Sequence, residues 1–335
     1  MREAVLLVGG QGTRLRPLTL TTPKPMLPVA GVPFLQHQIA KLRSAGIEHI
    51  VLATSYRAEV FQTYFGDGEQ FGVRLTYAEE SAPLGTGGAI GNAADLLTSE
   101  SDAPVVIYNG DVLSAHDLRG QISHHGNTRA SVTLHLVEVQ DAAAYGCVPT
   151  DASGWVTAFL EKMPNPITQW VNAGCYVFRR SVIDTIPRGA VVSVERETFP
   201  SLLADGQSIA SWKESAYWLD VGTPSTLVQA STDLVRGGYA SGEVLGAPAS
   251  ALSAPSAHVD PLATLSGGTY VGDGARVGAN AAVDSSIVMS DAIVEPGARV
   301  ARSVVGAGAR VEAGARVVGQ LIGDHETVGA NATSR

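Results

Sequence analysis

The C-terminal part of the chain carries a repeat that strongly limits how it can fold. From Val271 onward, β-branched residues return at steps of six, six and five, so the pattern has a period of 17 residues. Such a period, with three short apolar sides per turn, predicts a triangular parallel β-helix whose axis is filled by stacked β-branched side chains. The three predicted columns are Val271, Val288, Val305 and Ile322, then Val277, Val294, Val311 and Val328, and then Val283, Val300 and Val317. The glycines expected at the tight corners are Gly272, Gly278, Gly306, Gly323 and Gly329.

The part before this repeat shows apolar strands that alternate with amphipathic helices. Strands are predicted over 3–8, 49–54, 73–78, 104–109 and 131–139. One predicted helix, 33–45, has Phe34, Leu35, Ile39 and Leu42 on one face. A last helix has Thr223 as N-cap and Pro224 at its first position. This alternation predicts an α/β, Rossmann-like, mostly parallel sheet with helices on both faces.

Composition and charge set the domain boundaries and exclude several classes of protein. The interval 239–258 is rich in Gly, Ala, Ser and Pro, which predicts a linker between a domain over 1–238 and the β-helix over 259–335. The net charge of −9 argues against binding to nucleic acid or to an anionic membrane. No apolar run approaches the roughly 18 residues of a membrane span, and the apolar run near the start is too short for a signal peptide. We therefore expect a soluble, cytoplasmic protein whose two cysteines are buried and unpaired.

The segment LLVGGQGTRLRPLT, residues 6–19, places a glycine-rich turn directly after the first strand. Successive backbone N–H groups in such a turn form an anion-binding concavity. The dinucleotide fingerprint fails because Leu15 occupies its third glycine position, and the Walker A pattern is absent. The segment therefore predicts another kind of phosphate loop, with Arg14 at its end and Lys24 ten residues later. In a parallel sheet, ligands bind at the carboxyl ends of the strands, where the loops 9–14 and 109–111 begin.

With these pieces assembled, the chain resembles the sugar-1-phosphate nucleotidyltransferases, and most closely the mannose-1-phosphate guanylyltransferases. The matching motifs are VGGQGTRLRPLT (8–19), PKPM (23–26), PLGTGG (83–88), NGD (109–111), YGCV (145–148), EKMP (161–164), NAGCYVF (172–178), SVERETFP (193–200) and YWLDVGTP (217–224). The tail resembles the left-handed β-helix of hexapeptide-repeat proteins. The resemblance covers essentially the whole chain and implies that GTP and mannose 1-phosphate react to GDP-mannose and pyrophosphate.

The implied reaction requires positioning and charge neutralisation rather than a general base. A sugar phosphate has a second pKa of about 6, so the attacking phosphate is already largely ionised at pH 7. The resemblance assigns phosphate stabilisation to Arg14 and Lys24, and Mg²⁺ to Asp111 and Asp220, whose hard oxygen ligands suit that cation. It assigns nucleotide binding to Val8, Gly9, Gly10, Gly12, Thr13, Arg14, Glu80, Pro83, Gly85 and Thr86, and the sugar phosphate to Gly146, Glu161, Lys162 and Asn172.

A separate argument from the chemistry of the base points to Glu80. Guanine presents N1–H and N2–H₂ side by side, two donors that one carboxylate can accept, whereas thymine and uracil suit an amide. Glu80 lies five residues before Gly85, where thymidylyl relatives carry an amide, so we expect Glu80, or else Glu79, to recognise guanine. The roles of Glu195 and Glu197 stay open between a sugar contact and a surface pair. His124 and His125 are expected on an exposed helix face.

Three alternatives remain open. EKMP has one residue more before its proline than the commoner EKP, so another hexose or a cyclitol 1-phosphate is an alternative substrate. Another nucleoside triphosphate is an alternative to GTP. A hexapeptide acyltransferase would usually need a histidine on a coil, and the tail offers only His258 and His325. A non-catalytic regulatory subunit would be expected to lose the cations and carboxylates that this chain retains. We expect the β-helix to mediate assembly into a homo-oligomer.

Overall fold

The computed structural model describes residues 2–55, 57–161 and 163–330. It divides into two compact units, one formed by residues 1–10 and 41–218 and the other by residues 11–40 and 219–335. Helix α1 (Phe34–Ser44) and strand β13 (Trp218–Asp220) each begin in one unit and end in the other. Among the helices of the described residues, none is long and apolar enough to cross a membrane.

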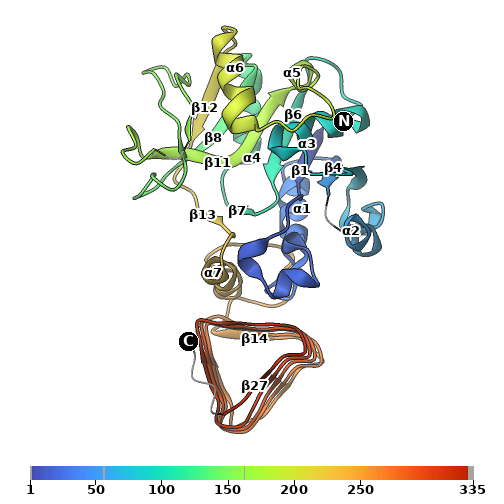
Figure 1. The fold of residues 1–335 in the computed structure, drawn as a ribbon, viewed down its shortest axis with the longest axis vertical. Helices are drawn as coiled ribbons and strands as arrows, with labels where there is room; N and C mark the ends of the chain where they lie inside the picture. The colour runs from blue at the N-terminus through green and yellow to red at the C-terminus, as the bar shows by residue number, and fades with distance from the viewer. Residues whose placement is uncertain (1, 56, 162, 331–335) are drawn as a thin grey trace. The chain divides into compact units, whose positions relative to one another are not determined.

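The first unit is built on a nine-stranded sheet (Figure 1). Its order is β10-β9-β11-β6-β1-β4-β5, with β8 between β11 and β12. Strands β6, β1, β4 and β5 run parallel, and β11 runs antiparallel to β6 and to β8. All five strands predicted from the sequence are present, and the antiparallel β11 makes the sheet mixed. The bounds are β1 Glu3–Leu7, β4 His49–Thr54, β5 Arg74–Glu79, β6 Pro104–Asn109, β8 Val132–Glu138, β9 Gly146–Cys147, β10 Leu160–Glu161, β11 Trp170–Arg179 and β12 Ile209–Lys213. Strand β7, Val112–Ser114, is not part of this sheet.

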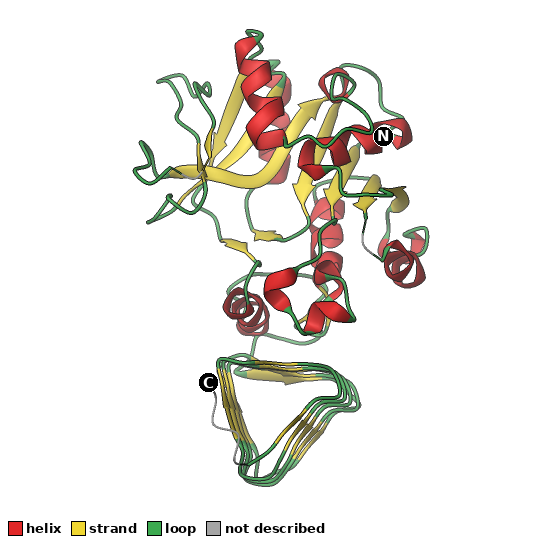
Figure 2. Cartoon of the chain, viewed as in Figure 1, coloured by secondary structure: helices red, strands yellow, loops and turns green. Residues whose placement is uncertain are grey.

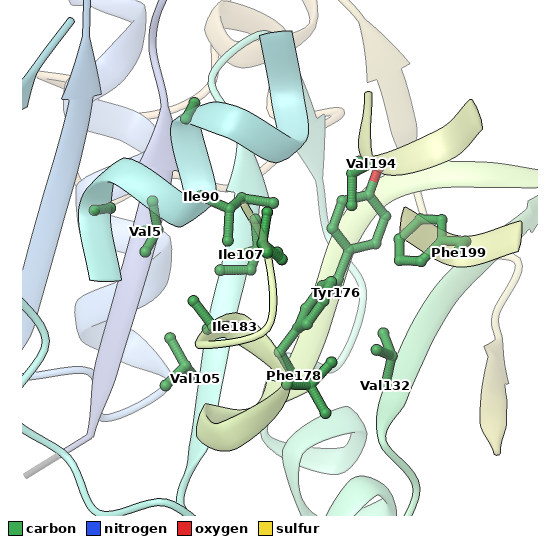
Figure 3. Packing of buried hydrophobic residues seen from close by; sticks show 14 of the residues in the cluster. Val5, Ile90, Val105, Ile107, Val132, Tyr176, Phe178, Ile183, Val194 and Phe199 are labelled. Carbon is green, nitrogen blue, oxygen red and sulfur yellow. The ribbon is translucent and has the colours of Figure 1, made fainter. Parts of the chain in front are cut away.

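Helices cover both faces of this sheet. On one face Ile90, Ile183 and Phe199 pack with the strand residues Ile107 and Phe178 in a continuous buried core (Figure 3). These three come from helices α3, α5 and α6. The helices of the unit are α2 Ala58–Phe65, η4 Glu69–Phe71, α3 Gly85–Ala93, η5 Ala94–Leu96, α4 Leu118–Thr128, α5 Arg180–Ile183, the π-helical turn η6 Val194–Thr198 and α6 Phe199–Ala204.

Helix α4 covers the other face of the sheet, and here one prediction is wrong. His125 is buried, and its Nδ1 lies 2.9 Å from Thr133 Oγ1 on β8, whereas we expected it on an exposed face with His124. Neighbouring residues on a helix point about 100° apart, so only the docking of α4 decides which histidine turns inward. The predicted burial of Cys147 and Cys175 as free thiols is confirmed.

The second unit begins with a series of short turns and ends in the β-helix. Helix α7 starts as predicted, because Thr223 and Thr226 form a reciprocal capping box and Pro224 holds the first position. The predicted apolar face of α1 is buried as well. The bounds are η1 Thr13–Leu15, η2 Leu18–Leu20, η3 Lys24–Met26, β2 Pro28–Val29, β3 Val32–Pro33 and α7 Pro224–Arg236.

The C-terminal strands form a left-handed parallel β-helix with a triangular section (Figure 2). Its three sheets contain the three predicted columns, since Val271 pairs with Val288, Val277 with Val294 and Val283 with Val300. Strand β14 falls inside the interval predicted as a linker. The bounds are β14 Ala251–Ser253, β15 His258–Val259, β16 Thr264–Ser266, β17 Thr269–Val271, β18 Arg276–Val277, β19 Ala282–Asp284, β20 Ile287–Val288, β21 Ile293–Val294, β22 Arg299–Ala301, β23 Val304–Val305, β24 Arg310–Val311, β25 Arg316–Val318, β26 Leu321–Ile322 and β27 Thr327–Val328.

The corners of the β-helix need small residues for a reason that the repeat did not show. An ideal Cβ placed on Gly306 would lie 2.7 Å from the backbone of Gly323 in the next coil, so the close approach of the coils excludes a side chain there. The left-handed backbone of the corners falls elsewhere, on positions that include Asn280, Asp291 and His325, with φ of 56°, 59° and 58°.

Candidate functional site

In the first unit, two of the predicted binding loops lie side by side at the carboxyl ends of β1 and β6. The N–H of Val8 donates to the Ala53 carbonyl at 3.1 Å, and the N–H of Gly110 donates to the Leu7 carbonyl at 2.8 Å. The first bond joins the end of β1 to β4, and the second joins it to the turn that carries Asp111, a partly buried carboxylate. Gly9 and Gly10, which follow Val8, are exposed. The structure therefore places Val8, Gly9 and Gly10 beside the NGD turn, as the topology of a parallel sheet predicts.

Asn172 stands at an irregularity of β11. The register of β11 against β8 shifts between Asn172 and Tyr176, and Gly174 within this bulge has φ of 74°. An ideal Cβ on Gly174 would lie 2.9 Å from Nδ2 of Asn109, so the bulge packs directly on the NGD turn. The Asn172 side chain is fixed at both ends, because its Oδ1 accepts from the Gly174 N–H at 3.1 Å and its Nδ2 donates to the Tyr176 hydroxyl at 2.8 Å.

Two other predicted sugar contacts are neighbours on the short antiparallel strands β9 and β10. Gly146 pairs with Glu161 in register, and an ideal Cβ on Gly146 would lie 2.6 Å from Glu161 Oε2. A side chain at position 146 would therefore displace this carboxylate. Lys162, the predicted phosphate contact, lies outside the described residues.

The loop after β5 carries the residues expected to bind the nucleotide. Glu80 is partly buried, and its Oε2 accepts from the Leu84 N–H at 3.2 Å, which closes the turn that contains the exposed Pro83. Burial raises the pKa of the Glu80 carboxyl, and the Leu84 N–H opposes this rise. Glu79 is exposed, and its Oε1 accepts from Gln62 Nε2 at 2.6 Å. Of the two carboxylates considered for guanine, Glu80 is the one held at the entrance to the PLGTGG motif.

A hydrogen-bond network that the sequence did not predict joins Thr86, a predicted nucleotide contact, to Asn172, a predicted sugar contact. Glu195 accepts from Thr86 Oγ1 at 2.8 Å through Oε2 and from the Tyr176 hydroxyl at 3.4 Å through Oε1. Tyr176 in turn accepts from Asn172, and its hydroxyl points toward the turn that begins at Val194 (Figure 3). Burial raises the pKa of Tyr176 well above its ordinary value, so its hydroxyl stays protonated. Glu195 is thus neither a surface partner nor an isolated contact, and only its motif, SVERETFP, hinted at a role.

In the second unit, the remainder of the glycine-rich loop packs against the PKPM segment. Gly12 has φ of 57°, in the left-handed region, and begins the turn that carries Thr13 and Arg14. An ideal Cβ on Gly12 would lie 3.0 Å from Cβ of Lys24, and the Gly12 carbonyl accepts from Thr19 Oγ1 at 2.9 Å. The two predicted phosphate-binding cations are therefore carried by one tightly packed group of turns.

Arg14 and Asp220 meet at the backbone of Gly222. An ideal Cβ on this buried glycine would lie 2.5 Å from Arg14 Nη2 and 3.2 Å from Asp220 Oδ1. Positions 14 and 220, more than two hundred residues apart in sequence, thus bring a guanidinium and a carboxylate to the same point of the second unit. A guanidinium is suited to binding phosphate, and a carboxylate is suited to binding a divalent cation.

Comparisons with known proteins identify the family of the chain. Residues 3–237 match the nucleotidyl transferase family model, and residues 248–333 match the GMPPB C-terminal domain. The mannose-1-phosphate guanylyltransferase of Mycobacterium tuberculosis is 50% identical over 301 residues, which cover 90% of this chain and 83% of that protein. A probable mannose-1-phosphate guanylyltransferase of Oryza sativa is 34% identical, covering 98% of this chain and 87% of that protein.

Among solved structures, HddC from Yersinia pseudotuberculosis superposes with a TM-score of 0.59 at 28% identity, covering 69% of this chain and 98% of that one. A family match to more than half of the chain, and relatives of this identity and coverage, establish the assignment. The chain belongs to the mannose-1-phosphate guanylyltransferase branch of the nucleotidyl transferase family.

Proposed function

We propose that this protein transfers the guanylyl group of GTP to mannose 1-phosphate and releases pyrophosphate. The observation that carries the proposal is one group of turns in which the glycine-rich loop with Arg14 packs against the PKPM segment with Lys24, and in which Arg14 lies beside Asp220. The names of the relatives support the substrate pair, since the Mycobacterium tuberculosis protein is a mannose-1-phosphate guanylyltransferase.

The reaction requires neutralisation of the negative charge of the triphosphate, and it requires no general base because the attacking phosphate is already ionised. An oxygen of the sugar phosphate attacks the α-phosphorus, and the bond from that phosphorus to the α,β-bridging oxygen breaks in line. The β- and γ-phosphates leave together as pyrophosphate. In this proposal Arg14 and Lys24 stabilise the charge that grows on the triphosphate, and the N–H groups of the glycine-rich loop bind its oxygens. Gly146, Glu161, Lys162 and Asn172 orient the sugar phosphate, and Glu195 holds Thr86 and Tyr176 so that the two substrates keep their geometry.

Asp111 and Asp220 are the carboxylates that we propose for Mg²⁺. Within the described residues, no group of three or more His, Cys, Asp or Glu is arranged to hold a metal. Two carboxylates are ligands of the kind that Mg²⁺ takes, because this cation prefers oxygen donors, keeps several waters and accepts phosphate oxygens as further ligands. When bound, the ion would neutralise charge on the triphosphate.

The function is tested by pyrophosphate release in the presence of Mg²⁺, with a matrix of nucleoside triphosphates against hexose and cyclitol 1-phosphates. The rate of pyrophosphate release with GTP and mannose 1-phosphate should exceed the rate with every other pair of substrates. GTP with another 1-phosphate would contradict the sugar assignment alone. Absence of release with every pair would contradict the catalytic proposal and favour a regulatory subunit.

Replacing Glu80 with glutamine should reduce the preference for GTP over UTP or dTTP by about ten- to a hundredfold. The change removes a charged acceptor of two guanine donors, and hydrogen bonds to charged groups are worth about 1.5–3 kcal/mol. Glutamine still offers an oxygen to the Leu84 N–H, so the turn should survive. Ratios of kcat/KM for the triphosphates measure the effect.

Glu79→Gln is the matched control for this prediction. It is the adjacent carboxylate, exposed and bonded to Gln62, and its replacement should leave the preference unchanged. If instead Glu79→Gln changes the preference and Glu80→Gln does not, guanine is recognised by the other carboxylate.

Assembly into a homo-oligomer through the β-helix is part of the same proposal. Parallel coils end in unpaired strand edges, which commonly associate with further chains. Light scattering after size-exclusion chromatography tests it, and a monomer at micromolar concentration would contradict it.

A further inference from the structure

The last coil of the β-helix touches the segment that carries the phosphate-binding cations, and both belong to the second unit. The Thr21 hydroxyl lies 2.6 Å from Asp324 Oδ2. Beside this contact, Pro17 packs on Gly323, since an ideal Cβ on Gly323 would lie 2.9 Å from Pro17 Cγ. A hydroxyl has one proton, and the carboxylate is closer to Thr21 than the Leu18 carbonyl at 3.0 Å, so the charged acceptor is the stronger partner.

Asp324 is itself held by the coil beneath it. Its other oxygen, Oδ1, accepts from the Ala307 N–H at 2.9 Å, and its neighbour Gly323 donates to Glu326 Oε2 at 2.8 Å. One carboxylate oxygen is therefore fixed by the β-helix while the other faces Thr21. Strands β26 and β27 of this coil pair in parallel with β23 and β24 of the preceding coil. The stacked coils therefore hold Asp324 in place, and Asp324 in turn holds Thr21.

Thr21 lies between the two turns whose geometry matters for phosphate binding. Two residues before it, Thr19 donates to the Gly12 carbonyl, and three residues after it comes Lys24, whose Cβ packs on Gly12. The chain is wound so tightly here that Thr21 and Thr22 both donate to the Leu18 carbonyl. Moving Thr21 would therefore move the loop on one side and Lys24 on the other.

Comparison with equivalent positions of the 17-residue repeat shows that the contact with Thr21 is not a general feature of the coils. The positions equivalent to Asp324 in earlier coils are Ala307, Ser290 and Asp273. The Asp273 carboxylate accepts from Ser256 Oγ of the preceding coil at 2.7 Å. Asp324 makes the same kind of contact between coils and adds the bond to Thr21, outside the β-helix.

We propose that Asp324 is a positioning residue for Arg14 and Lys24, acting through Thr21. In this proposal the β-helix supports the segment that carries Arg14 and Lys24, and the contacts of Asp324 and Gly323 with this segment determine its position. The inference builds on the proposed function, because it assigns the consequence of the contact to triphosphate binding and turnover.

The test compares Asp324→Ala with Asp273→Ala, the same repeat position in an earlier coil. Asp324→Ala should lower kcat/KM for GTP and weaken GTP binding, measured by calorimetry without sugar phosphate, by about tenfold each, whereas Asp273→Ala should change neither. Asp324→Asn keeps an acceptor oxygen without the charge and should lie between the wild type and Asp324→Ala. Thr21→Val should match Asp324→Ala, and the double variant should be no worse than either single one.

Hydrogen exchange of the amides in residues 12–27 supplies a readout that does not depend on catalysis. It should accelerate in Asp324→Ala and stay unchanged in Asp273→Ala, with melting temperatures to confirm that both variants fold. Unchanged exchange in Asp324→Ala, or faster exchange with normal GTP affinity and kcat/KM, would overturn the proposal. If the wild type is inactive with every substrate pair, the proposed function fails by itself, and GTP affinity together with exchange still decides the role of Asp324.

Discussion

Gly222→Ala should reduce turnover by about a hundredfold while the protein keeps its fold. The added methyl group would occupy a point 2.5 Å from Nη2 and 3.1 Å from Cζ of Arg14, so the guanidinium must move away. It would also lie 3.2 Å from the Asp220 carboxylate, close enough to shift the proposed Mg²⁺ ligand. Displacement of a positioning group by about 1 Å commonly costs about a hundredfold in rate.

The expected cost of this change to stability is small. The backbone of Gly222 does not lie in the left-handed region, so alanine is compatible with its conformation. The obstructing atoms of Arg14 belong to the far end of a flexible side chain, which can rotate. Steady-state kinetics, with the melting temperature measured beside it, separates the loss of activity from unfolding.

Gly242→Ala is the matched control, because an added Cβ there meets no atom within 4 Å and the residue lies in the same unit. It should leave both turnover and stability unchanged. If Gly222→Ala retained normal kcat and normal KM values, neither Arg14 nor Asp220 could hold the role that we assign to it.

Much of this architecture could be predicted because it depends on patterns that a sequence displays directly. The column Val271, Val288, Val305 and Ile322 is one buried line of the β-helix, as the 17-residue period predicts. Strand β4 is buried along its whole length, and its run of apolar residues over 50–53 is typical of a strand covered on both faces. The helix that begins at Thr223 follows from local capping chemistry. In each case the residues that determine the structure are close in sequence or regularly spaced.

The features that escaped prediction depend on how distant segments dock. Glu195 bonds to Thr86 and Tyr176, and no spacing rule relates these three positions. The buried orientation of His125 depends on Thr133, which belongs to a different element. The contact between Thr21 and Asp324 spans 303 positions. Motifs indicated which residues carry chemistry, whereas the bonds that hold those residues in place appeared only in three dimensions.

A cluster of buried histidines makes the stability of the first unit depend on acidity. The rings of His116 and His135 stack at 4.0 Å between centroids, with an interplanar angle of 18°. Nδ1 of His116 lies 2.9 Å from Ser114 Oγ. Both ring nitrogens of His135 are buried and have no hydrogen-bond partner among the described residues. A protonated ring at this position would thus be a buried charge without compensation.

These surroundings lower the pKa values of the histidines. Burial, and then the positive charge of Lys41, lowers the pKa of His135 to about 3. Burial, and then Arg179 and His124, lowers the pKa of His125 to about 4. Burial, followed by His135 and Lys41, also lowers the pKa of His116. In the unfolded chain all three would titrate near the ordinary value of 6.5.

The direction of the pH effect follows from the protons bound in each state. Below pH 6.5 the unfolded chain binds protons that the folded chain does not, so the free energy of unfolding falls as the pH falls. For His135 this loss continues down to about pH 3, and for His125 to about pH 4. At pH 5 each contributes a loss of about 2 kcal/mol relative to neutral pH. The free energy of unfolding should therefore drop steeply between pH 6.5 and 4.

His135→Phe should reduce the pH dependence of the free energy of unfolding by the contribution of one histidine. Phenylalanine keeps an aromatic ring stacked on His116, takes up no proton, and gives up no hydrogen bond that the described residues make with His135. Urea unfolding at pH 8 should give similar free energies for the variant and the wild type, whereas at pH 5 the variant should be more stable by about 2 kcal/mol. Parallel profiles for His135→Phe and the wild type would mean that His135 takes up its proton in the folded state, and the acid sensitivity would then have to arise from other groups.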